Sequence, residues 1–250
     1  MKKTVCTGFA AIILATTNPN FTAAQANEDK TNFNRAEIET IVREYLLSNP
    51  EIMLDVQAAL QEKQREAQQK AVLETIEVAS DELFHSANDG VIGNPDGDVT
   101  VVEFFDYNCG FCKRALTDME SLVQNDSNLR FVLKEFPILS EDSHKAHVVS
   151  MAVHLLEPEK YTEFHRKLLG GSERATEDSA IKVALDLGID ETALRQKMQD
   201  PAIDQIFGST YQLAEQLQIT GTPGYVVGKE IVSGALGEQV LREKIEAARQ

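Results

Sequence analysis

Tryptophan is absent from this sequence, and aromatic residues make up only 6% of it. A chain so poor in aromatic surface lacks the stacking platforms that proteins use to bind unpaired bases. Basic residues are also scarce, because 24 Lys and Arg stand against 40 Asp and Glu and give a net charge of −16. An acidic surface repels nucleic acids and anionic membranes. We therefore expect no nucleic-acid partner.

The sequence also lacks a hydrophobic run long enough to span a bilayer, which takes roughly 20 apolar residues. Its apolar stretch at residues 5–15 is shorter, follows Lys2 and Lys3, and precedes Ala24-Gln25-Ala26. A basic start, a short apolar stretch and an A-x-A site are typical of a secretory signal peptide. We predict a signal peptide at residues 1–26 that is cleaved after Ala26. The protein is then exported, with the bacterial periplasm as the best fit and secretion beyond it as the alternative.

Cysteine is the third scarce residue, with Cys6, Cys109 and Cys112 as the whole set. Cys6 is removed with the signal peptide, which leaves a single Cys-Gly-Phe-Cys pair in an oxidising compartment. A disulfide that closes so short a loop adds little stability to a chain of this length. The pair therefore favours a catalytic interpretation over a structural one.

A metal interpretation of the same pair is weaker. A zinc site needs about four ligands. His144 and His147 lie three apart on a predicted helix and could contribute, but nothing completes the set. Two thiolates can bind copper(I), as a side property of the pair. We expect no metal site and no cofactor, and we expect all five histidines to be surface or helix-cap residues.

The N-terminal part of the mature chain, residues 27–90, is predicted to be a helical region with a linker. Asn34 is a helix cap, Asn49-Pro50 ends one helix and starts another, and helices continue to about residue 85. We place these two or three helices outside the main core. A long helix with a thin apolar stripe pairs with a copy of itself or folds back on its own domain. The first alternative predicts a homo-oligomer.

Residues 91–250 carry the pattern of a mixed α/β sheet. Residues 88–98 are rich in Gly, Asn, Asp and Pro and read as a turn. A strand at 99–105, a helix at 110–124 and a strand at 129–136 form a parallel unit. Helices alone fill about 140–201, and the chain ends with four further elements: helix 202–217, strands 225–227 and 230–232 joined as a hairpin, and helix 237–248.

The cysteine pair lies where this pattern places a strand end against a helix start. The partial positive charge of a helix N-terminus stabilises a thiolate on Cys109 and lowers its pKa. Cys112 lies about one turn further on, where it can attack a mixed disulfide formed on Cys109. The spacing therefore suits thiol–disulfide exchange, with one attacking and one resolving sulfur.

Two further features accompany the pair. Glu103 lies in the apolar strand, either at a solvent-facing position or as a buried acid of raised pKa that relays protons. Thr222-Pro223 lies between a helix and a strand and is a simple turn on local grounds alone.

Residues 104–113 together with Thr222-Pro223 resemble the DsbA-like branch of the thioredoxin-fold proteins, and most of all its exported ScsC and Com1 type. The likeness covers about residues 91–250, and the helical stretch before them resembles the one found in that type. It implies a thioredoxin fold with an inserted helical domain at about 140–201 and an N-terminal helical extension.

The resemblance also implies roles for individual residues. Cys109 becomes the exposed nucleophile and Cys112 the buried resolving thiol. Pro223 becomes a cis residue packed against the pair, and Thr222 offers backbone hydrogen bonds to a substrate peptide. Glu103 matches the buried acid of the family.

The dipeptide between the cysteines departs from the strongest oxidases of the family, which have a histidine there. Gly110 and Phe111 occupy these positions, and Phe111 cannot stabilise a thiolate as histidine does. Threonine at position 222 is more similar to the disulfide isomerases. The resemblance therefore implies a less oxidising protein.

The resulting hypothesis is an exported isomerase or reductase that acts on cysteine-containing protein clients. A membrane or exported redox partner recycles the pair, and the N-terminal helices form a homo-oligomer. Three alternatives stay open: a dithiol oxidase, a copper-binding envelope protein, and an interaction protein that merely keeps the fold.

Overall fold

The computed structural model describes residues 34–250, so the predicted signal peptide at 1–26, its predicted cleavage after Ala26, and Cys6 lie outside the described residues. The chain divides into two compact units, Met1–Ala58 and Ala59–Gln250. Among the helices of residues 34–250, none has the length and apolar character needed to cross a bilayer.

The N-terminal helices form as predicted. Helix α1 (Arg35–Ser48) begins with a capping box in which Asn34 and Glu37 satisfy each other's backbone N–H groups, and it buries no residue. Helices α2 (Ile52–Val78) and α3 (Ser80–His85) follow. The expectation that these helices lie outside the main core is wrong for the end of this stretch. Ile76 and Leu83 are buried in the cluster that covers one face of the sheet.

The core of the larger unit is a mixed five-stranded sheet, which confirms the predicted fold class. Its spatial order is β1-β3-β2-β4-β5, and only β2 and β3 run parallel. Its strands are β1 (Gly90–Gly93), β2 (Val99–Phe105), β3 (Leu129–Glu135), β4 (Gly224–Val227) and β5 (Glu230–Ser233). The cysteine motif therefore follows the central strand.

Strand β1 lies inside residues 88–98, which the sequence pattern assigned to a turn. The strand pairs antiparallel with β3 at the edge of the sheet, with Gly90 opposite Leu133. Gly90 packs directly under the ring of Tyr161, so that a Cβ atom there would lie 1.8 Å from Tyr161 Cε1. The glycine that suggested a turn is needed for this close approach.

We expect Gly90→Ala to destabilise the protein by about 1–3 kcal/mol, because the added methyl group forces the buried Tyr161 ring to move. Urea denaturation of the two proteins measures this difference. Gly208→Ala in the middle of a helix is the matched control, since no atom lies within 4 Å of its added Cβ. Equal midpoints for wild type and Gly90→Ala would contradict the assigned packing.

The two faces of the sheet are covered by different helices, because side chains alternate along each strand. Val101 and Phe105 of β2 share a core with α4 (Gly110–Asn125) and α10 (Glu238–Ala248). Val102 and Phe104 face the other way, into a core with α3 and α9 (Pro201–Gln216). By this alternation Glu103 points to the side of α4, where the cysteines lie.

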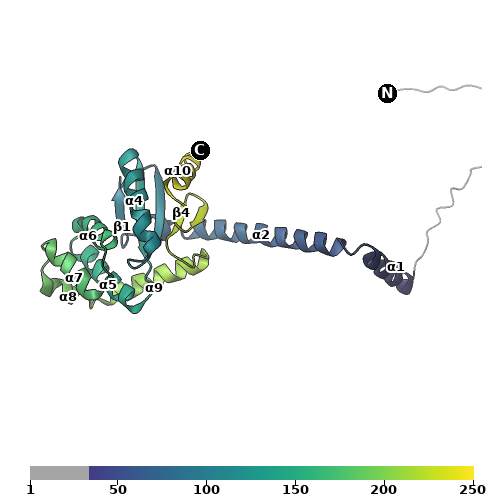
Figure 1. Ribbon diagram of the computed structural model, residues 1–250, viewed down its shortest axis with the longest axis horizontal. Coiled ribbons are helices and arrows are strands. Elements are labelled where there is room, and N and C mark those ends of the chain that lie inside the picture. Colours follow the sequence, from purple (N-terminus) through teal and green to yellow (C-terminus); the bar gives the residue numbers. More distant parts are fainter. Residues whose placement is uncertain (1–33) are drawn as a thin grey trace, which may run out of the picture. The chain divides into compact units, whose positions relative to one another are not determined.

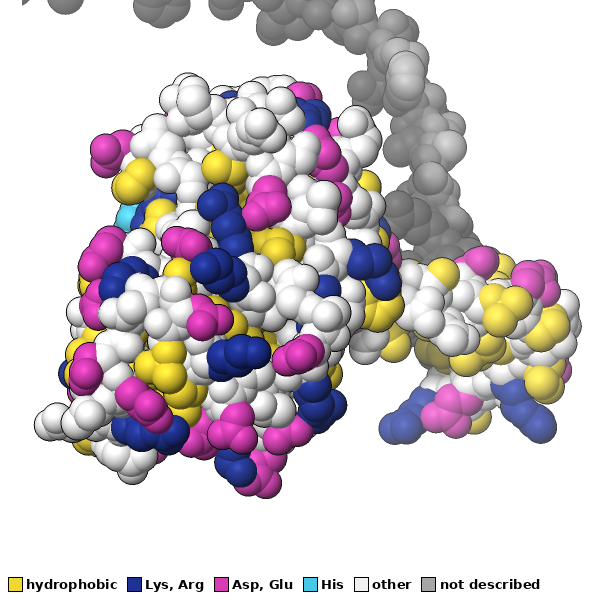
Figure 2. Space-filling view, turned by 60° about the vertical axis from the view of Figure 1, so that its left-hand side comes forward, with side chains coloured by type: hydrophobic (Ala, Val, Ile, Leu, Met, Phe, Trp, Pro, Cys, Tyr) yellow, Lys and Arg dark blue, Asp and Glu magenta, His cyan; other side chains and the backbone are white. Residues whose placement is uncertain are grey.

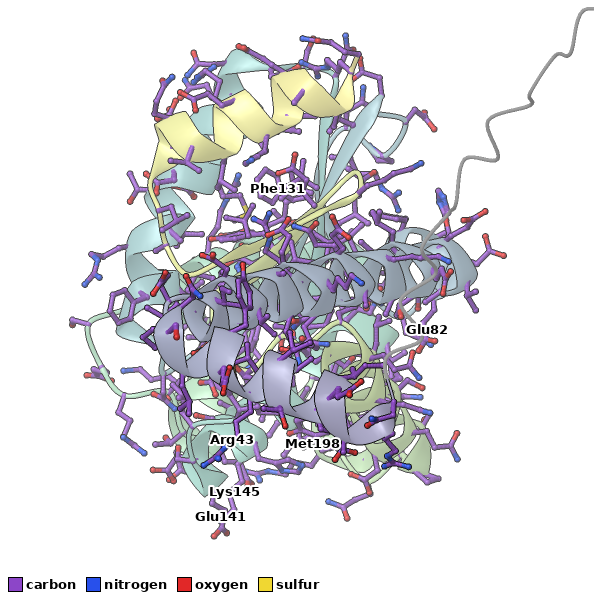
Figure 3. All side chains as sticks on the ribbon, turned by 90° about the vertical axis from the view of Figure 1, so that its right-hand side faces the viewer. Arg43, Glu82, Phe131, Glu141, Lys145 and Met198 are labelled. Carbon is purple, nitrogen blue, oxygen red and sulfur yellow. The ribbon has the colours of Figure 1, made fainter. Side chains whose placement is uncertain are left out.

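The predicted helical insert between β3 and α9 is confirmed, and its helices lie together at one end of the domain (Figure 1). They are α5 (Glu141–Leu156), α6 (Pro158–Gly170), α7 (Glu177–Asp186) and α8 (Glu191–Lys197). Their apolar residues join the same core as β2 and α4. Figure 3 shows Phe131 of β3 inside the molecule, whereas Glu141 and Lys145 of α5 pair at the surface.

Candidate active site

The turn after β2 delivers Cys109 to the start of α4, as predicted. Cys109 is the N-cap of the helix, and its Sγ accepts a hydrogen bond of 3.4 Å from the Cys112 N–H group. Its own N–H group donates to the Asp106 carbonyl oxygen at 2.9 Å. The buried Asp106 carboxylate accepts the N–H groups of Asn108, Ile138 and Leu139. These bonds leave the turn little freedom.

The two cysteines are free thiols with opposite properties. Cys109 keeps 5% of its surface exposed, so it is more covered than the resemblance implied, while Cys112 has none exposed. The hydrogen bond from Cys112 and the backbone N–H groups of Phe111 and Cys112 lower the pKa of Cys109 to about 5, against the effect of burial. The hydrogen bond to Cys109 and burial raise the pKa of Cys112. Near neutral pH, Cys109 is a thiolate and Cys112 holds its proton.

Glu103 is buried, with 2% of its surface exposed, so the solvent-facing alternative is excluded. Burial raises its pKa to about 8, although Tyr225 Oη donates a hydrogen bond of 3.5 Å to Glu103 Oε1. Its charge also acts on Cys112. A carboxyl group that titrates near neutral pH therefore lies close to the cysteine pair.

The peptide bond between Thr222 and Pro223 is cis, as the resemblance implied, and Thr222 contacts Cys109. The thiol form of Cys109 donates to the Thr222 carbonyl oxygen at 3.1 Å. The Pro223 carbonyl oxygen accepts the Gly234 N–H group at 2.8 Å, which connects the segment after β5 to the site.

The dipeptide between the cysteines faces solvent. Phe111 is 55% exposed, and the Arg114 guanidinium lies 4.4 Å from the centroid of its ring. No atom lies within 4 Å of the position that a Cβ of Gly110 would take. Phe111 thus offers an apolar contact, and the site does not sterically require glycine at position 110.

Two residues beside the cysteines were not singled out from the sequence. Asn108 donates to the Ala175 carbonyl oxygen at 2.9 Å and accepts its N–H group at 2.8 Å. Lys113 Nζ donates to the carbonyl oxygens of Gly171 at 2.8 Å and Glu173 at 3.2 Å. The loop between α6 and α7 is thereby fastened to the cysteine motif. Because these partners lie far away along the chain, no local sequence pattern indicates the role of Asn108 or Lys113.

The expectation for the histidines is wrong for His147 and His165, which are buried with 0% and 1% exposure. His147 bonds to Glu135, which accounts for its ring without a metal. Within residues 34–250, no group of three or more His, Cys, Asp or Glu side chains is arranged to hold a metal ion.

Two protein-family models match parts of the chain. A model of the DSBA-like thioredoxin domain matches residues 100–246, and a model of the copper resistance protein ScsC N-terminal domain matches residues 34–67. The chain is 26% identical over 167 residues to disulfide bond formation protein D of Bacillus subtilis, which covers 62% of this chain and 75% of that protein.

Solved structures are similar over longer spans. A thioredoxin-like oxidoreductase from Silicibacter pomeroyi is 39% identical, with a TM-score of 0.65 over 68% of this chain and 96% of that one. Proteus mirabilis ScsC in a transitional conformation is 26% identical, with a TM-score of 0.64 over 88% of this chain and 98% of that one. The family model covers more than half of the sequence and includes both cysteines and Thr222-Pro223. The chain therefore belongs to the DSBA-like thioredoxin family, whose members catalyse thiol–disulfide exchange.

Proposed function

We propose that this protein is an exported disulfide isomerase or reductase, with Cys109 as nucleophile and Cys112 as resolving thiol. The unequal ionisation of the two sulfurs carries this proposal. The Cys109 thiolate attacks one sulfur of a client disulfide, and the other client sulfur leaves as a thiolate. That thiolate attacks a second disulfide of the client, and the thiolate freed there attacks the client sulfur bound to Cys109. Cys109 then leaves as a thiolate, and the client is isomerised without net oxidation.

Resolution of the mixed disulfide completes the reductase route. Cys112 loses its proton and attacks Cys109 Sγ, the mixed disulfide breaks, and the second client sulfur leaves as a thiolate. Two electrons pass from the pair to the client, which departs as a dithiol. Glu103 has a pKa of about 8, and its ionised form is the buried base that takes the Cys112 proton.

Apolar side chains around the site support a client that is an unfolded, cysteine-containing chain. Phe111, Leu139 and Leu236 are all exposed by half or more. Leu139 bonds to Asp106 through its N–H group, and Leu236 bonds to Gly234, which bonds to Pro223. Backbone groups of Thr222 add hydrogen bonds to the bound peptide. Unfolded chains expose the apolar residues that such a surface binds.

The N-terminal unit supports self-association. Helix α1 exposes a row of apolar residues at helical spacing: Ile38, Ile41, Val42 and Tyr45. Hydrophobic side chains gather on the smaller body in Figure 2. A second copy of the same helix offers the complementary apolar face. A homo-oligomer presents several cysteine pairs to one client, which suits repeated attack during isomerisation.

Export completes the proposal. The signal-peptide pattern at residues 1–26 supports a periplasmic location for the mature chain. A membrane or exported redox partner then returns the pair to the dithiol form after each reduction.

The test is reactivation of scrambled ribonuclease by wild type and by Ile41→Asp, which puts a charge on the apolar row of α1. We expect sedimentation velocity to show an oligomer for wild type and a monomer for Ile41→Asp. We expect the variant to lose most of its isomerase activity and to keep insulin reduction within about twofold, because its cysteine pair is unchanged.

Thr40→Asp is the matched control, since it places the same charge on the opposite side of α1. It should keep both the assembly and the isomerase activity. A monomeric wild type, or isomerase activity that survives in Ile41→Asp, would contradict the role of α1.

A dithiol oxidase is the second candidate, because a pKa near 5 for Cys109 stabilises the reduced pair and makes the disulfide more oxidising. The reduction potential against glutathione separates the two. A value near about −120 mV favours the oxidase, and about −180 mV or below favours the isomerase or reductase. A protein that oxidises reduced ribonuclease and never reactivates the scrambled form is an oxidase.

A further inference from the structure

A buried carboxylate lies at the end of β3, outside the machinery described so far. Glu135 is 2% exposed and pairs in the sheet with Phe105, the last residue of β2. Its Oε1 accepts hydrogen bonds of 2.7 Å from Ser150 Oγ and from Tyr161 Oη. Its Oε2 pairs with His147 Nδ1. Three donors from α5 and α6 thus converge on one carboxylate.

Glu135 is an anion in this position. Burial alone raises the pKa of a carboxyl group, but the hydrogen bonds that His147, Ser150 and Tyr161 donate favour the charged form of Glu135. Burying such a group is costly, and apolar residues of the same size fill a core at least as well. A buried charge at position 135 therefore indicates a role beyond packing.

Two branches from Glu135 end on the same residue, Tyr107. In the first branch, Ser150 gives its proton to Glu135, so Ser150 Oγ accepts from Tyr107 Oη at 2.7 Å. In the second branch, the backbone N–H group of Tyr107 donates to His147 Nε2 at 3.2 Å. One carboxylate thus holds both the side chain and the backbone of Tyr107.

The second branch defines the state of His147. A backbone N–H group can only donate, so Nε2 must present its lone pair. The ring proton then lies on Nδ1, where it donates to Glu135, and the imidazole is neutral. The opposite tautomer would point Nε2–H at the Tyr107 N–H group.

Tyr107 belongs to the turn that begins α4, two residues before Cys109. The same turn supplies the Asp106 carbonyl oxygen that accepts the Cys109 N–H group. We propose that Glu135 and His147 are positioning residues for Cys109, which fix the turn through Tyr107 and so keep the sulfur within reach of its stabilising donors. This inference deepens the proposed function, on which it rests, and gives the inserted helices a part in the reactivity of the thiol.

The test compares two substitutions of one residue. In His147→Asn the amide nitrogen replaces Nδ1, so the bond to Glu135 is kept and the acceptor for Tyr107 is lost. In His147→Gln the amide oxygen replaces Nε2, so the acceptor is kept and the bond to Glu135 is lost. We expect His147→Asn to raise the pKa of Cys109, read from thiolate absorbance, by about one unit, a tenfold loss in ionisation constant. We expect a smaller rise in His147→Gln, in which Tyr107 keeps an acceptor that Glu135 no longer orients.

If His147 serves packing alone, both variants lose stability. The pKa of Cys109 then either stays unchanged in both variants or rises by the same amount in both. That result would overturn the proposal. If the variants do not fold, 15N NMR of the wild-type protein decides. We expect His147 to carry its proton on Nδ1, with Nε2 unprotonated, and protonated Nε2 would overturn the proposal.

Both measurements use the reduced protein without a client. Their failure would leave the proposed exchange activity untouched, and a missing exchange activity would leave the tautomer and the pKa readable. The two ideas therefore fail separately.

Discussion

Cys109→Ser is expected to lower the rate of exchange with insulin and scrambled ribonuclease by at least about a thousandfold, since it removes the attacking sulfur. Cys112→Ser is expected to accumulate a mixed disulfide between Cys109 and the client instead, because the sulfur that resolves this intermediate is gone. The asymmetry follows from the pKa values, which are lowered to about 5 for Cys109 and raised for Cys112.

Non-reducing gels and mass spectrometry of the trapped species measure this outcome. The double variant Cys109→Ser/Cys112→Ser is the control and should trap nothing. A client crosslinked to Cys112 in the Cys109→Ser variant would reverse the assigned roles of the two sulfurs.

The stability of the reduced protein relative to Cys109→Ser should increase with pH between about 5 and 9. The pKa of Cys109 is about 5 in the folded protein, against an ordinary value of 9.0. Between these values the unfolded chain binds one more proton, so the free energy of unfolding rises by up to about 1.4 kcal/mol per pH unit. The gain is lost as pH falls through 5. At pH 7 it amounts to about 1–3 kcal/mol, at the lower end if solvent screens the thiolate.

The comparison must be a difference between two proteins, because Glu103 acts in the opposite direction. Its pKa is raised to about 8, so the folded state keeps a proton that the unfolded chain loses, and stability falls as pH rises through this window. Glu103 is present in both proteins, and the subtraction removes most of its effect. Urea midpoints at pH 5, 6, 7 and 8 give the difference. Parallel curves would mean that Cys109 has an ordinary pKa.

Most of the sheet could be predicted because its strands are continuous β-branched and aromatic runs. Residues 99–105 are the clearest example, since a central strand is buried on both faces. Strand β1 could not be predicted, because Gly90 is required there by close packing against the ring of Tyr161, and Tyr161 lies far along the chain. The helical insert was visible from apolar spacing alone.

Some residues of the site could be predicted from the sequence, and others could not. The cysteine pair is local in sequence, so its place at a helix start followed from spacing, and Pro223 followed from the family resemblance. His147 and His165 could not be placed, since helical spacing does not tell which face a polar residue shares with a buried carboxylate. Basic side chains are interspersed with acidic ones on the face shown in Figure 2, and no pattern there indicates the site.

The anchoring of the α6–α7 loop has a consequence for motif grafting. Asn108 and Lys113 flank the four residues of the cysteine motif and bind the same distant loop. The transferable unit is therefore a six-residue segment together with the loop that it binds, rather than the Cys-Gly-Phe-Cys tetrapeptide alone. A chimera with a new tetrapeptide that keeps Asn108 and Lys113 also keeps the α6–α7 loop beside the site. A chimera that replaces these two residues changes access to the sulfur as well as its chemistry.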